Sequence, residues 1–329
     1  MEFSELTRLV SGHVEARIVQ AAVEIGVFDA IGGTPMDGPS IARRLGTDER
    51  ATMLLLNALA AVGLLEKTGD RFALGLASMK YLVRSSKHYL GGMIRFDSSL
   101  WKCWEQLPEA IRSGQPVRPA NMYQGDRAET EIFIDAMDSL VKARGDAEVL
   151  MSVLDWSGVA ELLDVGSGPA TYPIALCARF LELHATIFDL PATLAITEKY
   201  VREAGMMERI RLIAGDYRTD PIPGRYDTVF LSNIIHGEGE QDNLSLIQKL
   251  AAKLRAGGRL IVKDHILDEN RTNPPVGAIF SLLMLLTTKS GRCYSFNEIE
   301  SWMERAGLSR LQRLELPSPL TSSLVMGTK

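Results

Sequence analysis

Residues 161–170, Glu-Leu-Leu-Asp-Val-Gly-Ser-Gly-Pro-Ala, decide the fold. Their apolar first half predicts a buried β-strand, and Asp164, Gly166 and Gly168 follow where that strand turns into a loop. Glycines at such a turn permit positive φ angles and let a ligand approach the backbone closely. The stretch therefore predicts a ligand-binding turn at the carboxyl end of a strand.

Strand-like and helix-like segments alternate downstream of this turn. The further strands are expected at residues 185–190, 209–216, 226–233 and 258–264, and a helix between the last two is expected to stop at Gly257. Strands that alternate with helices form a parallel sheet covered on both faces. We therefore predict an α/β, Rossmann-like domain over residues 156–329.

The N-terminal part of the chain has a different pattern. Residues 1–90 predict a helix, a short helix closed by Gly46, a longer helix capped by Thr47 and a hairpin that turns near Gly69. This order is that of a winged helix-turn-helix. Residues 91–155 predict a mostly helical connector.

Length and composition indicate a globular protein of two domains. The chain has 329 residues, of which 46% are hydrophobic and 23% charged, with a net charge of −5. An acidic chain is a poor partner for nucleic acid or an anionic membrane. The three scattered cysteines form no disulfide or zinc-binding pattern, and no signal peptide is evident. The apolar run 276–286 is too short to span a membrane. We expect a cytoplasmic protein.

Aspartates end four of the expected strands. They are Asp164, Asp189, Asp216 and Asp264. A single aspartate in such a place is often a cap or turn residue, but four fit one crevice, because ligands bind outside the carboxyl ends of parallel strands. Thr171 stands where a dinucleotide fingerprint needs its third glycine. Asp164 would repel a pyrophosphate and attract a sulfonium or ammonium, which favours S-adenosylmethionine.

Other side chains fit the remaining parts of that ligand. Asp189 lies about 20 residues after the glycines, where an acid binds ribose hydroxyls. Asp216 can accept from an adenine amine, and Tyr217 either covers the base or belongs to the core. His236 follows the fourth strand, and an imidazole of pKa ~6.5 can act as a base. Strand alternation would place His265 on the far side of Asp264.

The order and spacing of these motifs resemble one family. LLDVGSGPA, FDLP, AGDY, SNIIH, LRAGGRLIVKD and EIESWMERAGL together make the chain similar, over essentially its whole length, to class I S-adenosylmethionine-dependent O-methyltransferases of the caffeate and hydroxyindole type. The resemblance implies a seven-stranded sheet whose last strand, near 322–328, is antiparallel. It also implies that residues 1–90 form a dimerisation domain, that residues 91–155 contribute to the substrate pocket, and that the acceptor is a small molecule.

The resemblance also implies a role for each motif residue. The cofactor-binding set is Asp164, Gly166, Gly168, Asp189, Asp216 and Tyr217. His236 matches the catalytic base, and Asp264 matches an acid that orients it. No metal is implied, since the magnesium-dependent catechol enzymes of this fold lack the N-terminal domain.

Two departures from the family pattern concern the base. Plant members have Asp-Trp after the histidine, whereas this chain has Gly237 and Glu238. Cys293 stands where a second acid is usual, and a thiol cannot hold an imidazole tautomer as a carboxylate does. We therefore keep three reactions open. The first is O-methylation of a phenolic, polyketide or quinone-like acceptor, and the second is methylation of an already acidic hydroxyl. The third is C- or N-methylation of a ring system, which includes tetrapyrroles.

An acceptor pocket should be apolar and aromatic. Its candidates are two pairs at i, i+4 spacing, Phe133 with Met137 and Phe280 with Met284, each of which could instead be a core stripe.

Two competing functions come from other classes of protein. One is a DNA-binding regulator, disfavoured because the expected recognition helix turns apolar after Arg50. The other is a cofactor-binding protein without catalysis.

Overall fold

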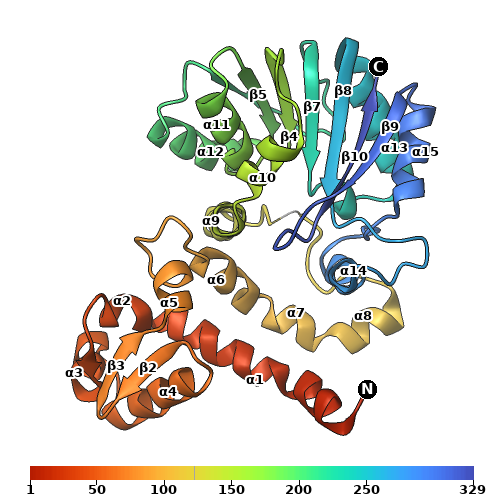
Figure 1. The fold of residues 1–329 in the computed structure, drawn as a ribbon. Coiled ribbons are helices and arrows are strands. Elements are labelled where there is room, and N and C mark those ends of the chain that lie inside the picture. The colour runs from red at the N-terminus through yellow and green to blue at the C-terminus, as the bar shows by residue number, and fades with distance from the viewer. Residues whose placement is uncertain (122) are drawn as a thin grey trace. The chain divides into compact units, whose positions relative to one another are not determined.

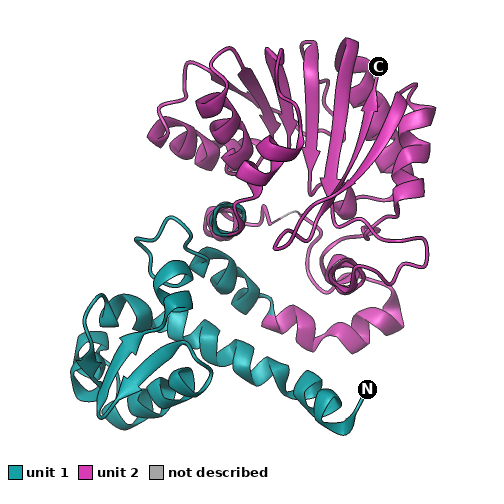
Figure 2. Cartoon of the chain, viewed as in Figure 1, with its two compact units in different colours: residues 1–100, 135–143 teal, residues 101–134, 144–329 magenta. Residues whose placement is uncertain are grey.

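The computed structural model describes residues 1–121 and 123–329. The chain divides into two compact units, residues 1–100 with 135–143, and residues 101–134 with 144–329 (Figure 2). The division passes through helix α9 (Arg127–Arg144), within the expected connector 91–155. The limits of the expected domains stay predictions.

The first unit contains the predicted winged helix-turn-helix. Its elements are α1 (Phe3–Ile25), α2 (Val27–Ile31), β1 (Met36–Asp37), α3 (Gly38–Leu45), α4 (Glu49–Ala61), β2 (Leu65–Thr68), β3 (Arg71–Leu74), α5 (Leu76–Tyr81) and α6 (Gly91–Ser99) (Figure 1). The strands form a sheet of order β1-β3-β2. The N-cap of α4 is Asp48 instead of the expected Thr47, because the Asp48 carboxylate accepts the Ala51 N–H at 2.7 Å.

The second unit is the α/β domain. Its strands are β4 (Glu161–Val165), β5 (His184–Asp189), β6 (Ile210–Ala214), β7 (Tyr226–Ser232), β8 (Leu254–Asp264), β9 (Ser309–Glu315) and β10 (Ser323–Thr328). Its helices are α7 (Trp101–Glu105), α8 (Leu107–Ser113), the first part of α9, α10 (Asp146–Val153), α11 (Thr171–Arg179), α12 (Pro191–Glu203), η1 (Ile235–Gly237), α13 (Glu240–Lys253), α14 (Pro275–Thr287) and α15 (Phe296–Arg305).

The strands of this unit form one seven-stranded sheet of order β6-β5-β4-β7-β8-β10-β9 among the described residues (Figure 1). β4 to β8 are parallel, and β10 runs antiparallel between β8 and β9. The α/β fold class and the antiparallel last strand are thus confirmed. Leu163, Val229 and Val262 lie in a core shared with α13 and α15, which explains the continuous apolar runs in the strands.

One boundary differs from the sequence prediction. Helix α13 ends at Lys253, and Gly257 lies inside β8. Leu254 pairs with Tyr226 of β7, so sheet pairing takes over before the glycine is reached. No helix in the described residues is both long and apolar enough to cross a membrane.

Candidate active site

The carboxyl ends of β4 and β5 are joined through the glycine loop. The Asp189 carboxylate accepts the Gly168 N–H at 2.9 Å and its neighbour Leu190 N–H at 2.7 Å. Gly166 and Gly168 have φ angles of 66° and 60°. A Cβ on Gly166 would lie 2.4 Å from Ile234 Cδ1, so only glycine fits this close approach. The expected ligand-binding turn is therefore a tight backbone cradle.

Asp164 and Asp189 are both buried without a cationic partner among the described residues. Asp164 accepts a hydrogen bond from the Ser167 hydroxyl at 2.6 Å. Burial raises the pKa of Asp164 to about 7, and the nearby Asp189 charge adds to this. Burial likewise raises the pKa of Asp189 to about 6, against two backbone hydrogen bonds that lower it. Both carboxyls are thus poised to ionise when donors approach them.

Asp216 follows β6 and is already engaged in an ion pair. Arg218 donates to it from Nε at 2.9 Å and from a terminal nitrogen at 2.8 Å, and these hydrogen bonds lower the pKa of Asp216. Tyr217 is buried, and its hydroxyl donates to Glu238 Oε1 at 2.7 Å. Neither partner was predicted from the sequence, and the adenine roles of Asp216 and Tyr217 stay predictions.

His236 and Asp264 meet between the ends of β7 and β8. His236 Nδ1 lies 2.8 Å from Asp264 Oδ1, and the short helix η1 carries the histidine. Burial alone would raise the pKa of Asp264, but the His236 charge and hydrogen bond outweigh it and the pKa lies below its ordinary value. Asp264 is therefore an ionised acceptor that fixes the proton of His236 on Nδ1.

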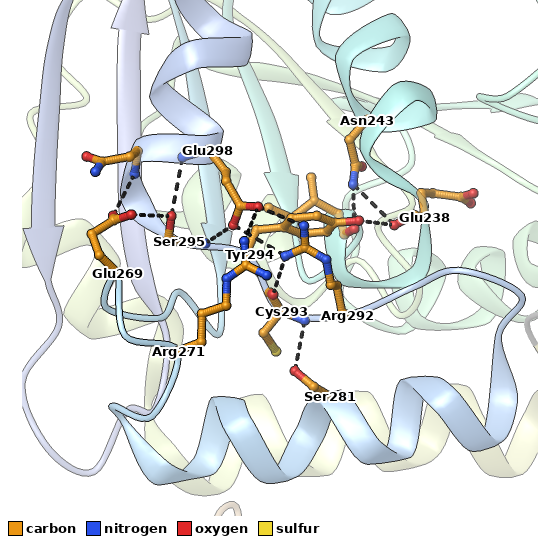
Figure 3. Close-up of polar contacts among 12 residues, drawn as sticks. Glu238, Asn243, Glu269, Arg271, Ser281, Arg292, Cys293, Tyr294, Ser295 and Glu298 are labelled. Carbon is orange, nitrogen blue, oxygen red and sulfur yellow. Dashed lines mark hydrogen bonds and ion pairs between the residues drawn. The ribbon is translucent and has the colours of Figure 1, made fainter. Parts of the chain in front are cut away.

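Asn243 and Tyr294, which lie near Glu238 in Figure 3, hold the backbone at residues 235 and 238, on both sides of His236. Asn243 Nδ2 donates to the Ile235 carbonyl at 2.8 Å, and the Tyr294 hydroxyl donates to the Glu238 carbonyl at 2.6 Å. A Cβ on Gly291 would lie 2.3 Å from the His236 carbonyl oxygen, so this segment packs directly on the histidine backbone. Sequence reasoning missed these supporting residues, because their partners are backbone atoms distant in the chain.

The candidate acceptor residues fall in different surroundings. The Phe280 ring contacts the His236 ring edge-on, with centroids 4.8 Å apart. Met284, one turn further along α14, is buried in the core. Phe133 stacks on Tyr123 with centroids 4.6 Å apart. Met137 belongs to the first unit, so its place in a pocket stays a prediction.

Comparison with known proteins settles which family has this architecture. A family model described as the O-methyltransferase domain matches residues 104–309, and one described as the O-methyltransferase dimerisation domain matches residues 7–84. The chain belongs to the O-methyltransferase family. Its members are S-adenosylmethionine-dependent methyltransferases, and the expectation drawn from the sequence motifs is confirmed.

Individual relatives cover the chain almost completely. The 3-hydroxy-5-methyl-1-naphthoate 3-O-methyltransferase of Streptomyces sahachiroi is 31% identical over 98% of this chain and 94% of its own length. The tetracenomycin polyketide synthesis 8-O-methyl transferase TcmO of Streptomyces glaucescens is 30% identical over 99% and 96%. The structure of PigF with SAH superposes with a TM-score of 0.89 at 25% identity, covering all of both chains.

The carboxyl edge of the sheet has features that fit the family's cofactor. The buried Asn233 Oδ1, at the end of β7, has no hydrogen-bond partner among the described residues, and Asn233 adopts a φ of 55°. A non-glycine residue with positive φ and an unpaired polar atom marks a place where a ligand donor fits. The glycine cradle and the two buried carboxyls complete a set suited to a ligand with hydroxyls and an ammonium group.

Cys293 departs from the family pattern as the sequence indicated. Its side chain is buried, and burial raises the pKa of the thiol to about 12, with the Asp264 charge adding to the rise. The thiol is therefore uncharged at neutral pH. It supplies no carboxylate to His236, which leaves Asp264 as its acidic partner among the described residues.

Proposed function

We propose that this O-methyltransferase transfers the methyl group of S-adenosylmethionine to a hydroxyl of a small aromatic acceptor, of the hydroxynaphthoate or aromatic polyketide class, with His236 as base. The observation that carries the proposal is the 2.8 Å hydrogen bond between His236 Nδ1 and the buried, ionised Asp264. The names of two relatives, which act on a naphthoate and in polyketide synthesis, suggest the acceptor class.

The tautomer decides what His236 can do. Because Asp264 accepts from Nδ1, the lone pair of a neutral imidazole is on Nε2. A phenol has a pKa of about 10 and is mostly protonated at neutral pH. His236 Nε2 takes that proton as the oxygen attacks, and Asp264 stabilises the imidazolium that forms. Such a base contributes about 10²–10⁴-fold to the rate.

The other contribution of the protein is to align the methyl donor and the acceptor. When bound, S-adenosylmethionine supplies an electrophilic methyl group together with its leaving group. We assign Asp189 to the ribose hydroxyls, Asp164 to the ammonium end, and the backbone of Gly166 and Gly168 to close contact with the cofactor. Fixing two reactants in line supplies about 7–11 kcal/mol of a barrier. Phe280, which packs on His236, is the apolar wall against which an aromatic acceptor lies.

The first experiment separates cofactor binding from methyl transfer. Calorimetry with S-adenosylhomocysteine should show micromolar binding to the wild-type protein and its loss in Asp189→Ala. A methyl-transfer assay with 3-hydroxy-1-naphthoate then compares wild type with His236→Ala, which should turn over at least tenfold more slowly at unchanged affinity for S-adenosylhomocysteine. Equal turnover in the two proteins would remove His236 from the mechanism.

The position of the methyl group tests the alternative chemistry. Carbon-13 NMR of a product made with labelled methyl distinguishes a methoxy group from a ring-bound or nitrogen-bound methyl. A methoxy signal supports O-methylation, and either other signal contradicts it.

We also propose that the chain acts as a homodimer through its dimerisation domain. Helix α1 exposes the apolar side chains of Leu6, Leu9, Val10 and Val14, each about half exposed or more. Such a stripe on a soluble helix marks an interface. Analytical ultracentrifugation should give twice the chain mass for wild type and a monomer for Leu9→Glu with Val10→Glu. A wild-type monomer at micromolar concentration would contradict the proposal.

A further inference from the structure

A second imidazole shares two neighbours, Asp264 and Phe280, with the candidate base. His265 directly follows Asp264, and its own backbone N–H donates to Asp264 Oδ1 at 2.7 Å. Strand β8 ends at Asp264, so the alternation that was expected to separate the two side chains no longer applies at His265. The His265 and His236 rings both contact Phe280, with centroid distances of 4.9 and 4.8 Å. Strand alternation did not predict that His265 and His236 share this ring neighbour.

The hydrogen bond of His265 determines its tautomer. Nδ1 lies 2.9 Å from the Thr321 carbonyl oxygen, which can only accept, so Nδ1 carries the proton. Burial lowers the pKa of His265, although Asp264 acts in the opposite direction. The ring is therefore neutral at physiological pH and its Nε2 has a lone pair. Nε2 has no hydrogen-bond partner among the described residues, and the side chain is partly exposed.

The ring is held by a rigid support. The Thr321 hydroxyl, on the residue that holds Nδ1, accepts from Arg144 at 3.1 Å. Arg144 in turn donates two hydrogen bonds to the fully buried Asp146, at 2.9 and 2.7 Å. The bidentate pair with a buried acid holds the Arg144 side chain in place, because breaking the pair would leave an uncompensated buried charge. His265 is thus preorganised, with its ring against Phe280, the ring that His236 also contacts.

We propose that His265 Nε2 accepts a hydrogen bond from a second hydroxyl of the acceptor, next to the hydroxyl that His236 deprotonates. This inference rests on the proposed function, since it assumes that the acceptor lies on Phe280. A neutral lone pair beside Asp264 favours a donor and disfavours a carboxylate directly next to the reacting hydroxyl. Within the acceptor class proposed above, the preferred members are those with two hydroxyls on one edge, and His265 is a residue that determines specificity.

Acceptor binding to the complex with S-adenosylhomocysteine tests this without depending on catalysis. The two probes are 2,3-dihydroxynaphthalene and 2-naphthol, which differ only in the second hydroxyl. A net hydrogen bond is worth about 0.5–1.5 kcal/mol, so wild type should bind the diol roughly 3–10-fold more tightly by calorimetry. Equal affinities, or no binding of either probe to the S-adenosylhomocysteine complex, would overturn the proposal with wild type alone.

Two amide variants distinguish a role of His265 in acceptor specificity from a purely structural role. In His265→Asn the amide occupies the position of Nδ1 and can still donate to Thr321, but nothing replaces Nε2. In His265→Gln the amide occupies the position of Nε2. We expect the Asn variant to lose the preference for the diol and the Gln variant to keep part of it, with melting temperatures close to wild type. Equal weakening of both probes in the two variants would show a merely structural histidine.

The failure of this inference can be told from failure of the proposed function. Absence of S-adenosylhomocysteine binding contradicts the proposed function. Binding of S-adenosylhomocysteine and methylation of 2-naphthol, without any preference for the diol, contradict only the role of His265.

Discussion

Buried carboxyls at two parts of the sheet's carboxyl edge have pKa values shifted in opposite directions. At the ends of β4 and β5, burial raises the pKa values of Asp164 and Asp189 to about 7 and about 6. At the end of β8, Asp264 is just as buried, but His236 keeps its pKa below the ordinary value. The proposed base and its acid are therefore paired within the chain, whereas the two carboxyls on the proposed cofactor side have no cationic partner among the described residues.

The largest expected effect is on turnover at Asp264 and on cofactor affinity at Asp189. Asp264→Asn should lower kcat by about 10²-fold or more, because the tautomer and the imidazolium lose their carboxylate, while affinity for S-adenosylhomocysteine stays unchanged. Asp189→Asn should do the reverse and weaken S-adenosylhomocysteine about tenfold or more. Steady-state kinetics and calorimetry measure both. If both variants lowered kcat and affinity for S-adenosylhomocysteine to the same extent, the two carboxyls would not have the separate roles proposed for them.

A pH dependence of cofactor affinity is the next largest effect. Donors that bind Asp164 and Asp189 favour the ionised carboxyls, so binding should release protons where these groups are partly protonated, near pH 6 to 7. Affinity for S-adenosylhomocysteine should therefore fall by at least about tenfold from pH 8 to pH 5.5. Calorimetry at both pH values, in buffers of different ionisation enthalpy, checks the affinity and the proton count. A flat profile would show that the two carboxyls are already ionised in the free protein.

Stability should change in opposite directions on the two sides. A raised folded-state pKa means that the folded protein holds the proton more tightly than the unfolded chain, so stability is lost as pH rises through that pKa. Asp164→Asn should accordingly raise Tm at pH 8, by about 2 °C or more. Asp264, whose pKa is lowered, contributes stability at neutral pH that is lost in acid, so Asp264→Asn should lower Tm. Thermal melts of both variants at pH 8 and pH 5 give the signs.

The smallest expected effect concerns Cys293. Its thiol is uncharged at neutral pH, so Cys293→Ser should leave kcat within about twofold of wild type while Asp264→Asn does not. A large loss of turnover in the Ser variant, in a protein with wild-type Tm, would show that the thiol acts on His236 directly.

Much of this protein was determined by its sequence alone. The apolar runs between residues 161 and 264 fix strands because both of their faces are buried, and the aspartates that end them mark the crevice edge. The place of Gly166 directly after a strand predicted a turn with positive φ, and the structure has a φ of 66° there. The winged helix-turn-helix followed in the same way from local periodicity and caps.

The tertiary structure decided what each side chain meets. Arg218 on Asp216, Tyr294 on the Glu238 carbonyl and His265 on the Phe280 ring are contacts that local patterns do not encode. Periodicity failed at Gly257, because pairing of Leu254 with Tyr226 ended the helix earlier. Local sequence sets backbone preferences, whereas hydrogen-bond partners and pKa shifts depend on which distant segments the fold brings together.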